Sequence, residues 1–389
     1  MNIEKILTNS TILRHYSIKI DGQEMIPDEI ISLEVKNDFF NFGISGVLKI
    51  KDSFDLNNSG IVLFNSSNKL TISIQDFLQD KSYRTYVITS VNYEPADERF
   101  KIIDIHFVDE ISYILNNTYL SKGFNTTPIA AFKEYLTYLG IDDIVSSNKM
   151  IYDIEDTSTL QQFVVPQNTS VFEYFSWLFM QDNIRIWQDR ATLHIKEVKP
   201  ASLIPQNDAN GNQIIYTNNT LNNEYIFKIH DFTEETNPTL LVNAINPISR
   251  VFRYNGEKKI IDTTINLNDM VSDLTLNTMD VSGLQRTVGE KYSTQSIFTT
   301  GQQAHDLFSV YMRNNQVHIV IPGSVKYSNI GYVANVQFKG NPMYPKTQLE
   351  GDRLSSGKYF ISAVSDRYIG DKLIQKLTLN RIDGQKPRA

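Results

Sequence analysis

The sequence predicts a mainly β protein with α+β insertions, in which two similar β-barrel domains accompany a smaller α+β domain. Three observations predict this architecture. Segments with period-2 alternation fill the early and late parts of the chain, capped helical patterns appear in the middle, and one hairpin pattern occurs twice. A chain of 389 residues is also too long for one ordinary hydrophobic core. The expected division is a first barrel at 1–115, an α+β domain at 116–200, a second barrel at 201–250 and 301–389, and an insertion at 251–300.

The first barrel rests on six alternating segments, each of which predicts a half-buried strand because successive side chains of a strand point to opposite faces. Their spacing is typical of antiparallel sandwiches and barrels. The segments are Tyr16–Ile20, Ile31–Val35, Gly46–Asp52, Leu70–Ile74, Tyr86–Val91 and Lys101–Phe107.

The α+β domain begins with a helix that Thr127 should cap, followed by Pro128 in the first turn and ended by Gly140. A second helix should start at Ser170, where Ser170 and Glu173 have capping-box spacing, and run to about Gln181. The segment Asn183–Ile195 then alternates around a short polar turn and predicts a hairpin.

The rest of the chain is less regular. Residues 205–223 are rich in Asn, Gln, Thr and Gly, which predicts an exposed loop at a domain boundary. Residues 253–300 are polar and weakly periodic, with 266–277 resembling a loop. A helix is expected over Gln302–Arg313, and strands over Val317–Ile321 and Val333–Phe338.

An internal repeat links the two ends of the chain. Tyr86–Asn92 (YVITSVN) and Tyr359–Ser365 (YFISAVS) are identical or chemically close at every position. A polar turn and a second alternating strand follow each of them. Chance similarity of strand composition remains an alternative, since β patterning is easily matched. Duplication would give a subunit two similar barrels, so that a threefold assembly presents six similar lobes to a sixfold partner.

Composition excludes several classes of function. The chain has no cysteine, which removes disulfides, thiolate nucleophiles and cysteine-based metal sites. Its 37 Lys and Arg stand against 44 Asp and Glu, and no basic run is present, which argues against tight nucleic-acid binding. No signal segment and no membrane span are expected.

No catalytic, cofactor or metal site is predicted. The common nucleophile, phosphate-binding and metalloprotease motifs are missing. Two acids could serve glycoside hydrolysis, but helix ends and solvated loops explain the paired carboxylates equally well. Trp177 and Trp187 are expected to pack against each other in the core. The six histidines lack metal-ligand spacing, and the paired carboxylates lie in polar connections: His15, His106, His194, His230, His305 and His318; Asp142-Asp143, Glu155-Asp156 and Glu234-Glu235.

Taken in order, these segments resemble the central hub protein of phage baseplates, related to the hub portion of VgrG-type spike proteins. Phe42–Ser53 is similar to the early strand of that family, which ends in Asp-Ser. The helix capped by Ser170 and the strand Ile186–Asp189 resemble its central module. The segment 304–323 and the hairpin Tyr359–Leu379 resemble its second barrel, whereas 253–300 matches nothing in the family.

The resemblance implies a virion protein of the contractile tail, made in the host cytoplasm, that forms a homotrimeric ring lining the channel for genome ejection. The ring would join the sixfold tail tube protein to a separate trimeric spike protein and contact other baseplate proteins, without enzymatic activity. Two alternatives remain open: a tail-associated glycan-binding or glycan-degrading protein, and another tail structural protein such as a tube or distal-tail subunit.

Overall fold

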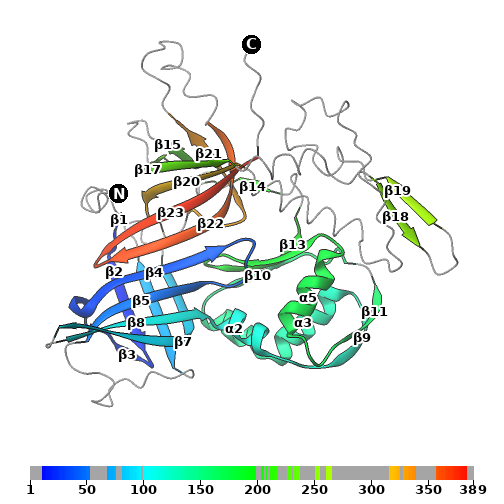
Figure 1. Ribbon diagram of the computed structural model, residues 1–389, viewed down its shortest axis with the longest axis horizontal. Coiled ribbons are helices and arrows are strands. Elements are labelled where there is room, and N and C mark those ends of the chain that lie inside the picture. The colour runs from blue at the N-terminus through cyan, green and yellow to red at the C-terminus, as the bar shows by residue number, and fades with distance from the viewer. Residues whose placement is uncertain are drawn as a thin grey trace, which may run out of the picture.

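Most of the described strands belong to one large, strongly curled and mainly antiparallel sheet, with an α+β module beside it (Figure 1). The computed structural model describes residues 11–52, 68–75, 81–97, 100–158, 160–198, 315–324, 327–338 and 356–382, with shorter stretches between 203 and 264. Strands dominate these residues, so the predicted mainly β class with α+β insertions is confirmed.

The first barrel forms from all six predicted strand segments. Its buried side chains come from alternate positions, such as Ile18 and Ile20 on β2 or Ile103, Ile105 and Phe107 on β8. The elements are β1 (Thr11–Ile12), β2 (His15–Ile20), β3 (Gln23–Glu24), a short 3-10 turn (Pro27–Glu29), β4 (Ile30–Asp38), β5 (Ser45–Asp52), β6 (Lys69–Gln75), β7 (Lys81–Asp97) and β8 (Phe100–Asp109).

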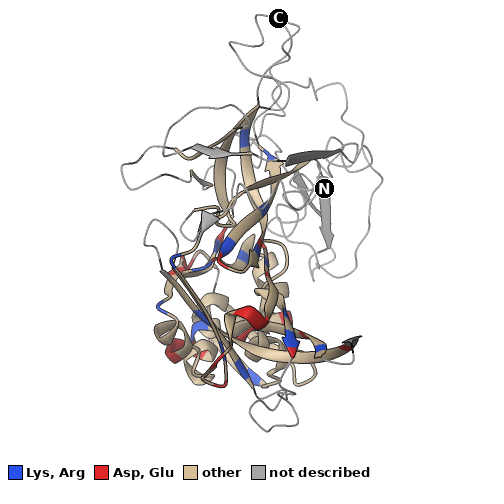
Figure 2. Ribbon diagram, turned by 90° about the vertical axis from the view of Figure 1, so that its left-hand side faces the viewer, with Lys and Arg blue, Asp and Glu red and all other residues tan. Residues whose placement is uncertain are grey.

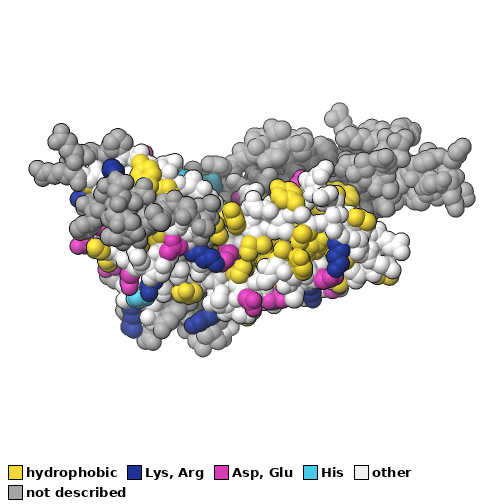
Figure 3. Space-filling view, turned by 90° about the horizontal axis from the view of Figure 1, so that it is seen from below, with side chains coloured by type: hydrophobic (Ala, Val, Ile, Leu, Met, Phe, Trp, Pro, Cys, Tyr) yellow, Lys and Arg dark blue, Asp and Glu magenta, His cyan; other side chains and the backbone are white. Residues whose placement is uncertain are grey.

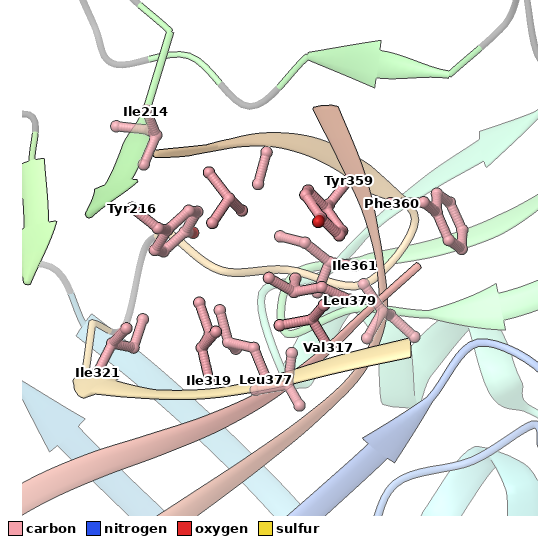
Figure 4. Close-up of a cluster of buried hydrophobic side chains, with 14 of the residues drawn as sticks. Ile214, Tyr216, Val317, Ile319, Ile321, Tyr359, Phe360, Ile361, Leu377 and Leu379 are labelled. Atoms are coloured by element: carbon pink, nitrogen blue, oxygen red, sulfur yellow. The ribbon is translucent and has the colours of Figure 1, made fainter. Parts of the chain in front are cut away.

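The second barrel has its own core of buried aliphatic and aromatic side chains, which point inward from several strands (Figure 4). Tyr216, Tyr359 and Phe360 are its largest fully buried members. The elements are β14 (Ile204–Pro205), β15 (Ile215–Thr217), β16 (Ile226–Lys228), β17 (Asp231–Thr236), β20 (Asn315–Pro322), β21 (Tyr332–Gln337), β22 (Gly357–Ile369) and β23 (Lys372–Arg381).

The hairpin β22–β23 belongs to both barrels. Near its open end, Phe360 and Leu379 lie in the second core, whereas Tyr368 and Leu373 at its tip lie in the first core. The outer edge of β22 pairs with β4 from Ala363↔Asp38 to Tyr368↔Leu33. One hairpin therefore joins the two barrels through backbone hydrogen bonds and through apolar packing. The domain bounds expected from the sequence stay a prediction.

The α+β module covers residues 110–197. It contains the third hydrophobic core of the molecule, which is formed mainly by helices. Thr127 accepts a hydrogen bond from the Ala130 amide and Ser170 accepts one from the Glu173 amide, so both predicted N-caps are confirmed. The elements are α2 (Glu110–Asn117), β9 (Lys122–Thr126), α3 (Pro128–Tyr138), α4 (Ile141–Ser147), β10 (Ile151–Ile154), β11 (Gln161–Val165), α5 (Val171–Met180), β12 (Ile184–Gln188) and β13 (Thr192–Glu197).

The two barrels share one topology. The pairing order β6-β7-β8-β5-β4 in the first barrel matches β21-β22-β23-β20-β17 in the second, and every pair is antiparallel. In chain order each set also runs the same way, with β18 (Arg250–Tyr254) and β19 (Ile260–Thr264) added between β17 and β20.

The registers of the two repeated hairpins agree from Tyr86↔Asp109 to Pro95↔Lys101, which match Tyr359↔Arg381 to Tyr368↔Leu373, and a second shift between Pro95 and Asp97 occurs only in β7–β8. The β7–β8 pairing shifts by one residue between Ile88 and Ser90, and the β22–β23 pairing shifts between Ile361 and Ala363. These are equivalent positions in the repeat read from the sequence. A bulge at the same place in both hairpins is hard to obtain from shared strand composition alone, and it favours duplication over chance.

Two expectations from the sequence fail. The polar stretch 205–223 contains a strand, β15, and Ile214 and Tyr216 are fully buried, because alternate apolar residues within it reach the second core. Trp177 is 46% exposed and does not pack on Trp187, which is 4% exposed and contacts Phe39 instead. The expected helix 302–313 and the loop 266–277 lie outside the described residues.

Candidate functional site

The three cores meet around the turn that joins β12 to β13. This turn, residues 189–191, belongs to the α+β module, and charged side chains of both barrels reach it. We call the set Arg84, Asp109, Asp189, Arg190 and Asp366 the junction. Four of its five members are less than 6% exposed, so their charges must be compensated within the protein.

Arg84 holds the turn from the side of the first barrel. Its Nη1 donates to the backbone oxygens of Asp189 at 3.0 Å and Arg190 at 3.2 Å, and its Nη2 donates to Asp109 Oδ1 at 2.9 Å. Asp109 also caps α2 by accepting from the Ser112 amide at 2.9 Å. Burial raises the pKa of the Asp109 carboxyl, and Arg84 offsets this only in part.

Arg190 holds the turn to the second barrel. Its Nη2 donates to both carboxylate oxygens of Asp366 on β22, and its Nη1 donates to the backbone oxygens of Ser324 and Tyr327. Gln375 on β23 donates to the same carboxylate at 2.7 Å. Burial alone would lower the pKa of Arg190, but the negative charge of Asp366 outweighs it and the pKa is raised.

Asp189 and His194 brace the turn from inside. Asp189 Oδ1 accepts from the amides of Ala191 and Thr192, both at 2.7 Å, and its Oδ2 lies 3.0 Å from His194 Nε2. The other ring nitrogen of His194 lies 2.7 Å from Asp153 Oδ2. The imidazole is thus held between two carboxylates, and its position is fixed on both sides.

The face of the His194 ring stacks on Trp187, with ring centroids 4.6 Å apart and planes 9° apart. Lys196 Nζ donates to Asp153 Oδ2 at 2.6 Å. Burial acts to raise the pKa of Asp153, but the hydrogen bonds from Lys196 and His194 lower it below its ordinary value. Asp153 is therefore paired with the Lys196 ammonium group.

The hydrogen bonds and ion pairs around the 189–191 turn hold it in a fixed position. Among the residues that the structure describes, no group of three His, Asp or Glu side chains is placed to hold a metal ion. Asp142 accepts hydrogen bonds from Thr137 and Tyr152, and Asp156 accepts from Thr127. Asp142 lies in the first turn of α4, whereas Asp156 lies in the loop after β10 and contacts the N-cap residue of α3.

The histidines do not come together. His106 Nε2 lies 3.2 Å from the Asn92 amide in the first barrel. His318 Nδ1 lies 3.1 Å from Thr378 Oγ1 in the second barrel. His194 belongs to the brace described above, and His230 and His305 lie outside the described residues. The structure thus gives no shared role to the histidines that it describes.

The surface carries apolar side chains and one open groove. Figure 3 shows hydrophobic side chains gathered over the α+β module, where Tyr138, Leu160 and Val164 are each more than 60% exposed. A groove of about 550 Å³ lies between α2 and the link from β4 to β5. Over the described part of the chain, charges of both signs are interspersed (Figure 2). Its helices include none long and apolar enough to span a membrane.

The junction was missed in the sequence, although a signal for it was present. Arg84 precedes Tyr86 and Ile88 at the inward-facing positions of β7, Asp109 follows Ile105 and Phe107 on β8, and Asp366 stands between Val364 and Tyr368 on β22. A charge at a core-facing position of an alternating strand needs a buried partner. Which partner it finds depends on the fold.

Comparison with solved structures places this fold among phage tail proteins. A tail protein from Neisseria meningitidis aligns with a TM-score of 0.56 at 12% identity, covering 94% of this chain and 96% of that one. The 43 kDa tail protein of prophage MuSo2 from Shewanella oneidensis aligns with a TM-score of 0.61 at 11% identity, covering 94% and 98%.

A third structure extends the likeness to secretion machinery. An E. coli component of the type VI secretion system, described as structurally similar to the phage T4 tail proteins gp27 and gp5, aligns with a TM-score of 0.51 at 8% identity, covering 95% of this chain and 79% of that one. No family model and no curated protein matches the sequence. The chain therefore has the fold of phage tail and type VI spike-related proteins.

Proposed function

We propose that this protein is a structural subunit of a phage-type baseplate, and that it acts as the central hub. In this role three copies form a ring that adapts the sixfold tail tube to a threefold spike and lines the channel for DNA passage. The observation that carries the proposal is the duplicated five-strand sheet, with its shared pairing order and its bulge at equivalent positions.

Duplication within one chain is a direct way to match two symmetries. A threefold ring of chains with two equivalent barrels offers six similar surfaces, while the remaining parts of each chain keep threefold symmetry. The α+β module has no second counterpart among the described elements, so it would supply threefold features. A sixfold tube and a threefold spike could then bind opposite faces without symmetry mismatch.

A symmetry adaptor must also keep its two barrels at a fixed angle. The continuous pairing of β22 with β4, the Arg190–Asp366 ion pair and the hydrogen bonds from Arg84 to the 189–191 turn resist rotation of one barrel against the other. Buried ion pairs add little net stability, but they penalise any geometry that separates them. Rigidity of this kind supports a structural role over a catalytic one.

The proposed partners are copies of this chain, the tail tube protein, a separate trimeric spike protein and other baseplate proteins. The proposed location is the tail of the virion, after synthesis in the host cytoplasm. With a net charge of −7 per chain, a ring would repel passing DNA rather than retain it. The tail would be a contractile one, and the ring would surround the path that the genome takes during ejection.

Electron-microscopy class averages of the purified chain at high concentration test the proposal, together with its mass by analytical ultracentrifugation. We expect threefold rings with six outer lobes and a central opening. Closed sixfold rings would indicate a tube or distal-tail subunit instead. A protein that stays monomeric when mixed with its spike protein would overturn the hub assignment.

A further inference from the structure

One long strand edge of the first barrel has no partner among the described strands. The strand β7 pairs with β6 only from Lys81 to Val87. After the Ile88 amide, which donates to the Asn68 oxygen at 3.1 Å, β7 continues to Asp97 beside β8, and no described strand pairs with its other edge. Thr89, Ser90, Asn92, Tyr93 and Glu94 are all exposed there, Tyr93 to 45%. An open edge of this length offers backbone groups that readily pair with another strand.

The equivalent edge in the second barrel is occupied. The bulge in each hairpin aligns Ser90 with Ala363 and Asn92 with Ser365. From Ala363 to Tyr368, β22 pairs with β4 of the first barrel, antiparallel and without interruption. The first barrel thus receives the hairpin of the second barrel, whereas its own hairpin has no receiving strand within the described chain.

The receiving strand also has an equivalent. In the matched pairing order, β17 takes the place of β4, and the two strands pair in the same register with β20 and β5. Thr233 lies opposite His318 where Glu34 lies opposite Val47. Among the described strands β17 pairs only with β20, and none of them pairs with its second edge.

We propose that β7 of one copy adds to β17 of a second copy and so repeats, between chains, the pairing that joins β22 to β4 within a chain. This inference rests on the proposed ring. The occupant is another copy because the chain itself already builds this interface once, and β7 and β17, whose second edges no described strand occupies, are the two halves of a second one. Donor and acceptor differ, so the contact is head-to-tail, and it closes into a threefold ring when successive copies are related by a rotation of about 120°.

The template also sets the register. Transferring Ser365↔Lys36 to the new interface places Asn92 opposite Glu235, Tyr93 opposite Glu234 and Glu94 opposite Thr233. No two like charges stand directly opposite each other in this arrangement, which would otherwise destabilise the pair. A shift by two residues brings Glu94 opposite Glu235 and is therefore disfavoured.

Cysteine cross-linking tests this register cleanly, because the protein has no cysteine of its own. The variant N92C/E235C should form covalent dimers and trimers under mild oxidation, seen on non-reducing gels and lost with reductant. Its matched control is S365C/K36C, the same pair within one chain, which should form a bond without a change in mass. The pair N92C/T233C, two residues out of register, should cross-link at least tenfold less because its Cα atoms lie too far apart.

Native mass spectrometry of the same samples separates the two levels of the proposal. Trimers without preferential 92–235 cross-linking would overturn the strand addition and leave the ring standing. Monomers at high concentration would overturn both, and a 92–235 bond within one chain would overturn the intermolecular contact. In the wild-type protein, hydrogen exchange at 89–94 should slow at least tenfold in the trimer fraction relative to the monomer fraction, and equal exchange would contradict the proposal.

Discussion

Arg190 donates from Nη2 to both carboxylate oxygens of Asp366, at 2.7 and 2.6 Å, across 176 residues of sequence. The pair connects a turn of the α+β module to the hairpin that both barrels share. Neither side chain is free to move without leaving a buried charge unpaired, since Asp366 is 5% exposed. The contact therefore couples all three cores, and its loss has a predictable cost.

Replacing Arg190 with Met should lower the free energy of unfolding by about 3–5 kcal/mol, because Asp366 and the backbone oxygens of Ser324 and Tyr327 lose their donor. Urea denaturation followed by circular dichroism measures this change. Removing Asp366 as well, in R190M/D366L, should restore part of the loss, since the unpaired buried charge is then gone.

The matched control is Lys122→Met, which breaks the ion pair with Glu134. Both of these side chains are more than half exposed, and exposed pairs contribute at most about 1 kcal/mol. If R190M and K122M lowered the free energy of unfolding equally, the buried Arg190–Asp366 pair would stabilise the protein no more than an exposed ion pair does.

Gly46→Ala should destabilise the first barrel by about 1–3 kcal/mol, because a Cβ at this position would lie 2.3 Å from both the Glu34 backbone oxygen and the Phe107 ring. Gly123→Ala is the control, since its Cβ would meet nothing closer than Val164 at 3.8 Å. Thermal unfolding of the two variants should separate clearly, and a tolerant Gly46 would mean that β4 and Phe107 can move apart.

Much of this fold could be predicted from local pattern. The alternation in 16–107 and the caps at Thr127 and Ser170 are set by neighbouring residues, and the structure confirms them. The strand Ile215–Thr217 is not predicted because only a few alternating residues interrupt a polar stretch, and its burial depends on the distant strand β21. Local composition cannot predict pairing with a strand that lies more than a hundred residues away in the sequence.

The junction shows the same limit at the level of side chains. The alternation of the strands places Arg84, Asp109 and Asp366 at inward-facing positions. Their pairing depends on the β12–β13 turn, for which the sequence predicts only a short polar turn. Trp177 was assigned to the core because of its residue type, but its neighbours at helical spacing place it on the outer side of α5.

The two tryptophans should respond oppositely to substitution. Trp187→Ala should cost about 3–5 kcal/mol, because it opens a cavity beside Phe39 and removes the surface on which His194 stacks. Trp177→Ala, on an exposed face, should change the free energy of unfolding by about 1 kcal/mol or less.

Fluorescence provides the check on these two variants, since each retains a single tryptophan. The emission of W177A, which reports Trp187, should lie at shorter wavelength than that of W187A. Similar emission from both variants would contradict the buried position of Trp187.

Acidification should release the brace at Asp153. The pKa of this carboxyl is lowered in the folded protein by its hydrogen bonds to Lys196 and His194, so the folded state binds the proton less readily than the unfolded state. A lowered pKa contributes stability above the ordinary pKa of Asp, about 3.9, and that contribution is lost as the pH falls through the folded value. Asp153→Asn should therefore be less stable than the wild type at pH 6, and the difference in melting temperature should shrink between about pH 4 and pH 2. Other carboxyls titrate in both proteins and cancel in the comparison, so a difference that stays constant or widens on acidification would show that the Asp153 charge does not stabilise the brace.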